Sequence, residues 1–523
     1  MHLLLQGFMG TGKSTVGRLV AERAGAPFVD LDEAVVERAG RSIPDIFAME
    51  GEASFRRLEA AALHAALAAS PPTVIALGGG ALLDRSLRRR VLARARVVTL
   101  AAHAETIAAR TAQAGRPLLD DAPSRLDRIR DMLVGRADAY AEAHAQIPTD
   151  DLTPADVASR VLAAWARPAI AVALGSRSYV VRAGTRELHL VAEAVEALRP
   201  SAIFVITDEN VQLRHGSALA GALTARGLSP RATAVLPPGE QHKQLATVER
   251  ALAAMVAAGA DRDAVVLAHG GGVVTDMGGL AAALLLRGVR WVAVPTTLLA
   301  MVDASVGGKT GVDVGPAKNA IGAFHQPSAV IIDAAHVSTE TERGFSSGLA
   351  EVVKSAAIGD TALFELLESD PASVLAREPS VVQRLVLRSV AVKAAIVARD
   401  ERESGERALL NFGHTVGHAL ESEGGYARLT HGEAVALGIV ASLRIGIALG
   451  LTDRALAERV IAALDQLHLP TDLDAQPLAA ALPRVSLDKK RRGGAIQFVL
   501  LRTLGDALVH PIDPADLPAL LRG

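Results

Sequence analysis

Short apolar runs alternate with longer amphipathic runs over the first third of the chain. The run HLLLQ precedes a glycine-rich turn, and residues 13–24 have helical periodicity. Further β runs at residues 73–77 and 97–100 are each followed by an Ala-rich helical stretch, and a final helix is predicted over residues 154–165. This alternation predicts a parallel sheet with helices on both faces.

A second alternation starts after Arg167-Pro168. The β runs AIAVAL, SYVVRAG, AIFVIT, AVVLA and WVAVP are separated by helical stretches, and a glycine turn lies at residues 270–272. After about Asp333 the β signal fades, and Ala/Leu/Val helical patterns continue to the end. We therefore predict three domains: an α/β domain at 1–167, a second, nucleotide-binding type of α/β domain at 168–335, and a mainly α-helical domain at 336–523.

The composition and the net charge indicate which classes of molecule the protein can bind. Half of the residues are hydrophobic and 21% are charged, as expected for a chain that buries large cores. The net charge of -2 provides no basic field for a nucleic acid. No apolar run approaches the ~20 residues of a membrane helix, and the start of the chain is unlike a signal peptide. We expect a cytoplasmic protein that binds small molecules and neither nucleic acid nor membrane. Since Cys is missing, a bound metal would need His, Asp or Glu ligands.

Lysine and asparagine are rare in this chain. Of 55 basic residues only eight are Lys, and only three residues are Asn. A chain that uses Arg wherever any cation suffices is expected to keep Lys where a compact point charge is needed. The rare residues are therefore candidate site residues: Lys13, Lys243, Lys309, Lys318, Lys354, Lys393, Lys489, Lys490, Asn210, Asn319 and Asn411.

Residues 7–15 read GFMGTGKST, which satisfies the phosphate-loop pattern between a predicted strand and a predicted helix. Backbone N–H groups at such a helix start bind phosphates. Lys13 is predicted to hold the β and γ phosphates and Ser14 to ligate magnesium. Asp30 and Asp32, two apart on a predicted strand end, are expected to point the same way, one toward magnesium and one toward a substrate hydroxyl.

Further motifs are SFRRLE at residues 54–59, the glycine turn at 78–80, GRPLL at 115–119 and GRADAY at 135–140. Together with the phosphate loop and the two Asp, they resemble shikimate kinase over residues 1–167. The resemblance implies a P-loop fold that uses ATP with Mg²⁺, bound by Ser14 and Asp30. It also implies that Asp32 accepts the proton of the attacking hydroxyl and that Arg116 lies on a lid. The implied catalytic residues are Lys13, Asp32 and Arg116. The implied ATP-binding residues are Gly10, Thr11, Gly12, Lys13, Ser14, Thr15, Arg110 and Arg116. The implied shikimate-binding residues are Asp32, Arg56, Gly78, Gly79, Gly80 and Arg136.

Several separated blocks follow in residues 168–523: TDEN, PPGEQHK, GGGVVTD, DASVGGKT, AEVVK, NFGHTVGH and HGE. Glu351 and Lys354 are three apart, and His414 and His418 are four apart, so each pair shares a helix face. Three His within 18 residues, beside an Asn of the rare set, favour a site over ordinary packing.

These blocks resemble 3-dehydroquinate synthase from end to end. The resemblance implies a Rossmann-like NAD domain followed by a helical metal-binding domain, with NAD and Zn²⁺ (or Co²⁺) as cofactors. Its implied metal ligands are Glu351, His414 and His431, with one position open as in catalytic zinc sites. The implied NAD-binding residues are Asp208, Asn210, Glu240, Lys243, Gly271, Gly272, Asp276, Thr296, Thr297, Lys309, Lys318 and Asn319. The implied substrate-binding residues are Arg287, Asp303, Lys309, Lys354, Lys393, Arg407, Asn411, His418 and Lys489. Of these, Asp303, Lys309, Lys354 and His418 are assigned to catalysis.

The two resemblances together imply a bifunctional enzyme of aromatic amino acid (chorismate) biosynthesis. One half would phosphorylate shikimate. The other would cyclise 3-deoxy-D-arabino-heptulosonate 7-phosphate to 3-dehydroquinate, with loss of phosphate and regeneration of NAD. The synthase half could assemble as a homodimer.

Other functions stay open at this point. The kinase half could act on gluconate or a nucleoside monophosphate, and the second half could be a sister sugar phosphate cyclase or a glycerol dehydrogenase relative. A scaffold with inactive sites is a further alternative. Two positions depart from the family pattern: His269 stands before the glycine triplet, and Gly279-Leu280 stands where Gly-Phe is common. Both departures concern packing near NAD.

Overall fold

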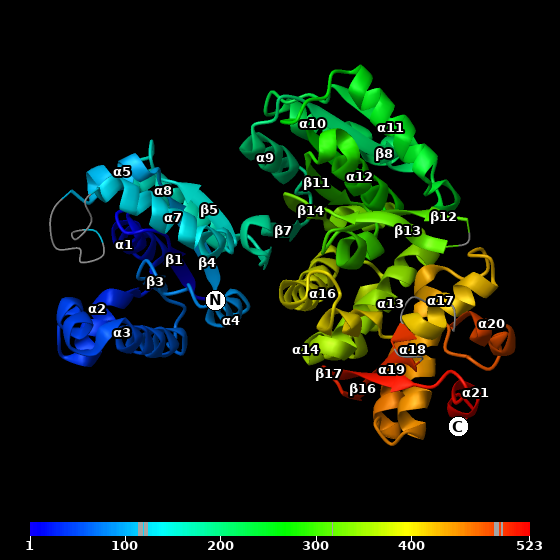
Figure 1. Cartoon of the computed structure of the whole chain (residues 1–523). Coiled ribbons are helices and arrows are strands. Elements are labelled where there is room, and N and C mark those ends of the chain that lie inside the picture. The colour runs from blue at the N-terminus through cyan, green and yellow to red at the C-terminus, as the bar shows by residue number, and fades with distance from the viewer. Residues whose placement is uncertain (113–118, 120–123, 316, 486–490, 493–494, 523) are drawn as a thin grey trace. The chain divides into compact units, whose positions relative to one another are not determined.

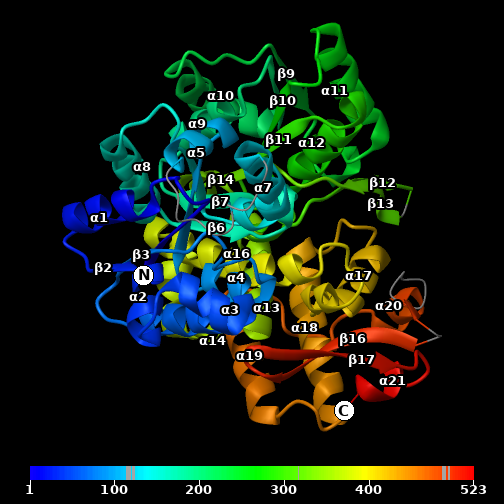
Figure 2. The ribbon, with the colours of Figure 1, turned by 60° about the vertical axis from the view of Figure 1, so that its left-hand side comes forward.

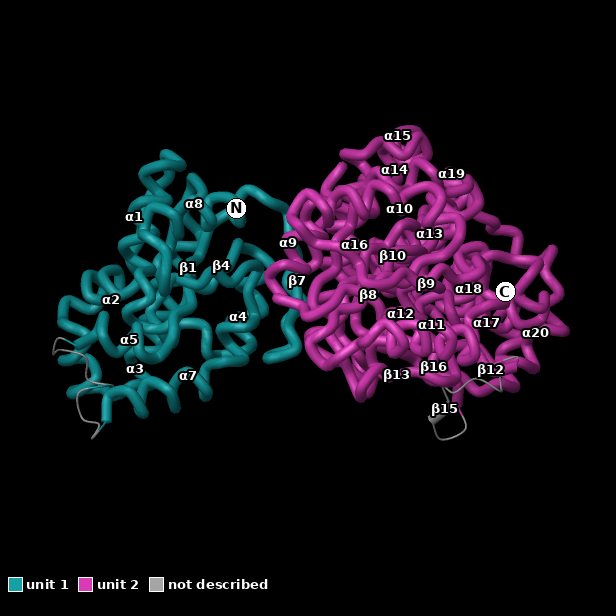
Figure 3. Tube along the Cα trace, turned by 90° about the horizontal axis from the view of Figure 1, so that it is seen from above, with its two compact units in different colours: residues 1–180 teal, residues 181–523 magenta. Residues whose placement is uncertain are grey.

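The structure is a computed structural model that describes residues 1–112, 119, 124–315, 317–485, 491–492 and 495–522. The chain forms two compact units, Met1–Val180 and Val181–Gly523 (Figure 3). Three candidate site residues, Arg116, Lys489 and Lys490, lie outside the described residues. The division into residues 1–167, 168–335 and 336–523 stays a prediction.

The first unit contains a five-stranded parallel sheet of order β2-β3-β1-β4-β5. Its strands are β1 (Leu3–Gln6), β2 (Phe28–Asp30), β3 (Val74–Ala76), β4 (Arg96–Ala101) and β5 (Ala145–Pro148). Its helices are α1 (Lys13–Ala24), α2 (Leu31–Ala39), α3 (Ile43–Leu67), α4 (Arg85–Leu92), α5 (Ala104–Arg110), α7 (Arg125–Ala141) and α8 (Pro154–Ala166). The predicted strand-turn-helix opening, the two further strands and the final helix are confirmed.

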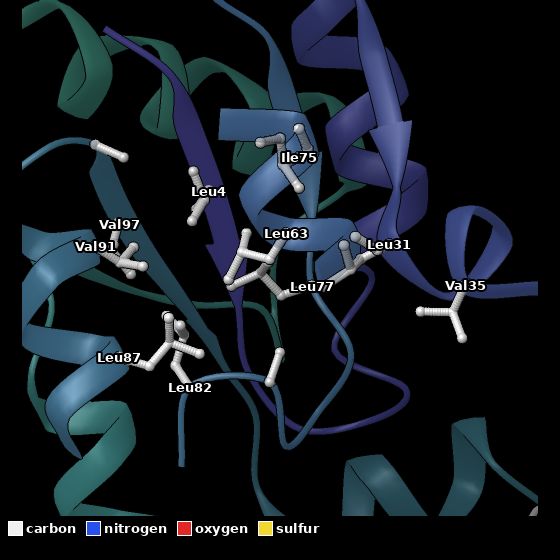
Figure 4. Close-up of a cluster of buried hydrophobic side chains, with 14 of the residues drawn as sticks. Leu4, Leu31, Val35, Leu63, Ile75, Leu77, Leu82, Leu87, Val91 and Val97 are labelled. Atoms are coloured by element: carbon white, nitrogen blue, oxygen red, sulfur yellow. The ribbon is translucent and has the colours of Figure 1, made fainter. Parts of the chain in front are cut away.

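Both faces of this sheet are buried. Successive residues of a strand point to opposite faces, and helices cover each face. Leu4 of β1 belongs to a core shared with α2, α3 and α4, whereas Leu3 and Leu5 pack with α1 and α8. Figure 4 shows the first of these cores, with Leu4, Ile75 and Val97 on neighbouring strands. The carboxyl ends of the strands are thereby held in place under the phosphate loop.

A seven-stranded sheet of order β6-β7-β14-β11-β10-β8-β9 follows. Its strands are β6 (Ala169–Val172), β7 (Tyr179–Gly184), β8 (Ile203–Asp208), β9 (Ala232–Leu236), β10 (Val265–Gly270), β11 (Arg290–Pro295) and β14 (Ala329–Asp333). The associated helices are α9 (His189–Leu198), α10 (Glu209–Thr224), α11 (Leu245–Ala257) and α12 (Gly272–Leu284) (Figure 1). Strands β8, β9, β10, β11 and β14 are parallel, so their carboxyl ends meet at one edge, the usual place for a ligand in such sheets.

The rest of the second unit is mainly helical, as predicted. Its helices are α13 (Glu342–Gly359), α14 (Thr361–Ser369), α15 (Pro371–Leu375), α16 (Pro379–Arg399), α17 (His414–Glu423), α18 (His431–Ala448), α19 (Arg454–Gln466), α20 (Leu478–Val485) and α21 (Leu517–Leu520). Short 3₁₀ or π turns in the second unit are η2 (Glu240–His242), η3 (Leu285–Arg287), η4 (Ala300–Ala304), η5 (Ala334–Thr339) and η6 (Glu406–Asn411), and η1 (Gly175–Arg177) lies in the first unit.

Two antiparallel elements were not predicted. One is the hairpin of β12 (Lys309–Val314) and β13 (Ala317–Phe324). The other is the sheet of β15 (Arg491–Arg492), β16 (Ala495–Thr503) and β17 (Asp506–Ile512), which lies near α18 and α19 (Figure 2). The expectation that helical patterns continue to the chain end is therefore wrong for residues 495–512. Their Val/Leu/Ile-rich pattern fits a buried strand and a buried helix alike, and periodicity alone does not separate the two.

One helix in the described part of the chain is long and apolar enough to cross a membrane by length and composition alone. It is α18, and 72% of that stretch is buried inside the protein. The burial fits a core helix of the second unit.

Helices α17 and α18 approach closely at Gly438. A Cβ atom at this position would lie 1.7 Å from the carbonyl oxygen of Gly413. The Gly438→Ala substitution should therefore push the helices apart and destabilise the second unit by about 1–3 kcal/mol. Urea unfolding followed by circular dichroism measures this change. The matched control is Gly221→Ala in α10, where an added Cβ meets nothing within 4 Å. Equal stability of the two variants would contradict the prediction.

Candidate active sites

The phosphate loop connects β1 to α1 in the first unit. Gly10 and Gly12 have φ angles of 80° and 91°, which glycine adopts without a steric penalty. Gly12 is the N-cap of α1, so free backbone N–H groups of the first helical turn face the loop. The Lys13 ammonium donates to the carbonyl oxygens of Gly7 and Phe8, both at 3.0 Å. The predicted phosphate-binding residues thus form one turn at a helix start.

Asp30 and Asp32 face different neighbours. Ser14 Oγ donates to Asp30 Oδ2 at 2.6 Å, and the other Asp30 oxygen caps α2 by accepting from the Asp32 backbone N–H. Asp32 lies beside Gly78, where a Cβ atom would come within 2.8 Å of its Oδ1. The prediction that Asp30 and Asp32 lie two apart on a strand is wrong, because β2 ends at Asp30 and the chain turns directly into α2.

The glycine turn 78–80 lies between two guanidinium groups. Arg136 donates to the Gly79 carbonyl oxygen at 3.1 Å, and a Cβ on Gly80 would lie 2.5 Å from an Arg56 nitrogen. Arg56 also pairs with the buried Glu59 at 2.7 Å, a residue that sequence reasoning missed. Burial raises the pKa of Glu59, against the opposing effect of Arg56. Asp32, Arg56, Arg136 and the turn are therefore brought together.

Arg110, predicted on the adenine side, is held away from this turn. Its guanidinium donates to the Thr149 hydroxyl at 3.0 Å and to the Thr149 carbonyl oxygen at 2.7 Å. Thr149 directly follows β5, so Arg110 is fixed at the carboxyl ends of the strands.

A cavity of about 2190 Å³ lies in the second unit. All twelve residues predicted to bind NAD line it, and so do six of the nine predicted substrate residues. The six are Asp303, Lys309, Lys393, Arg407, Asn411 and His418. Of the other three, Lys354 is buried beside Asp303 at 3.6 Å, and Arg287 is exposed and does not line the cavity. Lys489 is outside the described residues.

The NAD-side residues come from strand ends and from the β12–β13 hairpin. Gly271 is the N-cap of α12, directly after β10, and Asp208, the last residue of β8, is the N-cap of α10. The buried Lys243 ammonium lies 2.6 Å from Asp276 and donates to Asn319 Oδ1 at 2.6 Å. Lys243, Asp276 and Asn319, which are far apart in the sequence, thus form one polar cluster.

Glu351, His414 and His431 converge on one point. Nε2 of His431 and Nε2 of His414 lie 3.2 Å and 3.3 Å from Glu351 Oε1. Nδ1 of His414 donates to the Phe412 carbonyl oxygen at 3.1 Å, so that Nε2 is the ring nitrogen that can bind a metal. Burial opposes protonation of His431, yet the hydrogen bonds to Glu351 and Glu421 raise its pKa to about 10. The potential ligand atoms of Glu351, His414 and His431 lie within 4.8 Å of one another, and one carboxylate with two imidazoles suits zinc.

A second group of the same kind shares His431. His418, Glu421 and His431 also have their potential ligand atoms within 4.8 Å of one another.

Asp303 lies between two buried ammonium groups. It sits on the π-helical turn η4, and Lys393 donates to its Oδ1 at 2.8 Å. Burial would favour the neutral acid, but Lys393 and Lys354 together hold the pKa of Asp303 well below its usual range. Lys354 also forms an ion pair with Glu351, so the metal ligands and the substrate-side charges belong to one network.

Three family models match the chain. The model "Shikimate kinase" matches residues 9–166, "3-dehydroquinate synthase N-terminal" matches 233–347 and "3-dehydroquinate synthase C-terminal" matches 348–491. Over 354 residues the chain is 44% identical to the 3-dehydroquinate synthase of Acidithiobacillus ferrooxidans, covering 68% of this chain and 97% of that protein. The chain belongs to the 3-dehydroquinate synthase family. In front of the synthase part it carries a shikimate kinase domain.

A second curated relative and a solved structure are also similar to the synthase part of the chain. The 3-dehydroquinate synthase of Paracoccus denitrificans is 45% identical over 358 residues, 67% of this chain and 96% of that protein. A solved 2-epi-5-epi-valiolone synthase from Streptomyces hygroscopicus subsp. jinggangensis 5008, with NAD⁺ and Zn²⁺ bound, matches with a TM-score of 0.60 at 32% identity. It covers 66% of this chain and 96% of that one.

Sequence reasoning missed two carboxylates of the synthase part. Glu403 lines the cavity, forms an ion pair with Lys309 and accepts from Asn411 Nδ2 at 2.8 Å. Glu421 contacts both His431 and Lys318. With 57 acidic residues in the chain, no scarcity distinguishes them. The signal that remains is indirect, since each partners a rare Lys.

His269, the departure noted before the glycine triplet, is buried in the synthase part. Its ring centroid lies 5.5 Å from that of His336, which in turn lies 4.5 Å from that of His215. Burial lowers the pKa of His269 to about 3, so the ring is neutral near pH 7. Of these three rings only that of His215 lines the cavity. At Gly279, the other departure, a Cβ would lie 2.4 Å from the Thr310 methyl carbon.

Proposed function

We propose that this chain is a bifunctional enzyme of aromatic amino acid (chorismate) biosynthesis. Its kinase domain would phosphorylate shikimate with ATP, and its synthase part would convert 3-deoxy-D-arabino-heptulosonate 7-phosphate to 3-dehydroquinate. The family models support both activities, and the curated relatives support the synthase activity. The observation that carries the synthase proposal is one cavity lined by the whole predicted NAD set, by most of the predicted substrate set and by His431.

In the kinase domain, positioning and charge neutralisation supply most of the catalysis, as in other phosphoryl transfers. We assign phosphate binding to Lys13 and the helix start, Mg²⁺ to Ser14 and Asp30, and acceptance of the hydroxyl proton to Asp32. The forks of Arg56 and Arg136 would bind the substrate carboxylate. Product identification with shikimate and ATP tests this proposal. Phosphorylation of gluconate or a nucleoside monophosphate in preference to shikimate would contradict it.

In the synthase part, the cationic wall of the cavity would bind the anionic substrate. Lys309, Lys393 and Arg407 line the cavity. Lys393 and Lys354 keep the Asp303 carboxylate charged, and His418 would move a proton. A metal bound by Glu351, His414 and His431 would supply Lewis-acid polarisation, and bound NAD would supply reversible hydride acceptance. Zn²⁺ or Co²⁺ fits the donor set.

The remaining predicted roles belong to this proposal as well. Arg110 and Arg116 would act on the ATP side, and Lys489 on the synthase substrate. Arg287 is exposed and does not line the cavity, and a homodimer through the synthase part belongs to the same proposal. A cytoplasmic location, and partners limited to small molecules, fit this function.

Incubation of the pure chain with 3-deoxy-D-arabino-heptulosonate 7-phosphate, NAD and zinc, with identification of the product, tests the synthase proposal. A sister cyclase would form a product other than 3-dehydroquinate from another sugar phosphate. A scaffold with inactive sites would form no product.

The synthase should lose substrate affinity above pH 8. Burial lowers the pKa of Lys393 to about 8, against the opposing effect of Asp303. Below that pH the ammonium is charged and attracts the substrate, and above it the amine is neutral. The kcat/KM should therefore fall by up to about tenfold per pH unit beyond the pKa. In Lys393→Arg the side chain stays charged, so this decline should disappear. A decline that persists unchanged in Lys393→Arg would contradict the assignment.

A further inference from the structure

Glu421 uses its two oxygens for two different partners. Oε2 lies 3.3 Å from Nδ1 of His431, and Oε1 accepts from the Lys318 ammonium at 3.1 Å. The side chain is almost fully buried, at 2% exposure. Glu421 therefore connects the N-terminal residue of α18 to the β12–β13 hairpin from its own position in α17.

The first partner of Glu421, His431, can bind a metal through Nε2 only when its ring proton is on Nδ1. His431 directs Nε2 toward Glu351 Oε1, where His414 Nε2 also points. A neutral imidazole binds a metal only through its unprotonated nitrogen, so Nδ1 must carry the proton. A carboxylate accepts a hydrogen bond and donates none. Glu421 thus fixes the metal-binding form of His431 in the way that the Phe412 carbonyl oxygen fixes that of His414.

The second partner of Glu421, the Lys318 ammonium, needs a negatively charged neighbour. Lys318 lies 3.6 Å from Glu240 and 4.6 Å from the ring centroid of Tyr426, and it lines the cavity among the predicted NAD residues. Glu421 is its nearest carboxylate. The same charge that orients His431 therefore anchors the hairpin lysine.

We propose that Glu421 is a positioning residue that holds the metal ligand His431 and the NAD-side Lys318 at once, and that no neutral side chain can satisfy both. The inference rests on the proposed metal site of Glu351, His414 and His431. It assigns Glu421 no bond to the metal.

The nearly isosteric Glu421→Gln substitution divides these two duties. An amide has one acceptor oxygen and one donor nitrogen. If the oxygen faces Lys318, the NH₂ group faces Nδ1 of His431 and favours the tautomer that protonates Nε2, which cannot bind metal. If the amide flips, two donors meet at Lys318. Because an ammonium against an NH₂ group is the costlier contact, the first orientation should prevail and metal affinity should fall.

Removing Lys318 should reverse this effect. In the double variant Glu421→Gln/Lys318→Met, the amide is free to turn its oxygen to His431, so Nε2 becomes available again. The single variant Lys318→Met should keep the affinity of the unmodified chain for metal, because Glu421 still accepts from His431. A structural role of Glu421 predicts no such rescue, and neither does direct metal ligation by Glu421 within the His418, Glu421 and His431 group.

The test is a Co²⁺ titration of the metal-free full chain without substrate or NAD, followed by the visible absorption of bound Co²⁺. We expect Glu421→Gln to weaken Co²⁺ binding about 10–100-fold, the usual effect of losing an outer-shell partner, and the double variant to recover most of that loss. Equal affinity of Glu421→Gln and the unmodified chain, or a double variant as weak as Glu421→Gln, would overturn the proposal. If the unmodified chain itself fails to bind Co²⁺, the proposed metal site fails instead. Should Glu421→Gln not fold, a double variant that folds and still binds Co²⁺ weakly overturns the inference as well.

Discussion

The His431→Ala variant should lose synthase activity by about 10³-fold or more while its kinase activity stays unchanged. His431 is one of the three proposed metal ligands, because its Nε2 and that of His414 both lie within 3.3 Å of Glu351 Oε1. Two remaining donors hold a divalent ion poorly, and Lewis-acid assistance is worth several kcal/mol, or about 10³-fold in rate. His431 is partly exposed at the start of α18, so the fold should tolerate Ala. Bound zinc per chain and phosphate release measure the loss.

The control for this variant is His189→Ala. His189 is 50% exposed and does not line the cavity. It should keep full zinc content and full synthase activity. A His431→Ala protein that retains both zinc and activity would contradict the assigned ligand set, and the kinase activity of the same sample reports that the first unit is intact.

The Lys13→Ala variant should show the opposite pattern, with kinase activity lost and synthase activity kept. The Lys13 ammonium folds over the phosphate loop at the start of α1, where it would neutralise charge on the transferred phosphoryl group. Removing one such electrostatic partner costs about 10²–10³-fold in kcat. Formation of ADP in the presence of shikimate measures it.

Arg18→Ala is the matched control on the same helix. Arg18 is 57% exposed and pairs with the exposed Glu33, and such surface pairs contribute little. Its kinase rate should equal that of the unmodified chain. A Lys13→Ala variant that loses both activities while remaining folded would contradict the independence of the two sites.

Residue scarcity alone predicts much of both sites. All six Lys among the described residues lie in one of the two sites: Lys13 in the phosphate loop, Lys243, Lys309, Lys318 and Lys393 on the cavity wall, and Lys354 against Glu351. The three Asn all line the cavity. The physical reason is that a compact ammonium or a neutral amide meets a geometric need that a guanidinium does not.

Several features escaped sequence reasoning, and three of them show why. The turn at Asp30 depends on its side chain capping α2, which separates Asp32 from the strand. Glu403 and Glu421 could not be distinguished from other acids, because their roles come from partners about 100 residues away in sequence, Lys309 and Lys318. The strand β16 is largely buried by long-range packing, and it pairs with β17, which local periodicity does not encode. Local patterns predicted the elements, whereas the contacts between distant elements required the fold.

Phosphate and NADH can be followed together in one sample, in which the pure chain is incubated with 3-deoxy-D-arabino-heptulosonate 7-phosphate, NAD and zinc. We expect one phosphate released for each 3-dehydroquinate formed, with no net accumulation of NADH. Accumulation of NADH in step with substrate consumption, without phosphate release, would identify a dehydrogenase and contradict the proposed synthase activity.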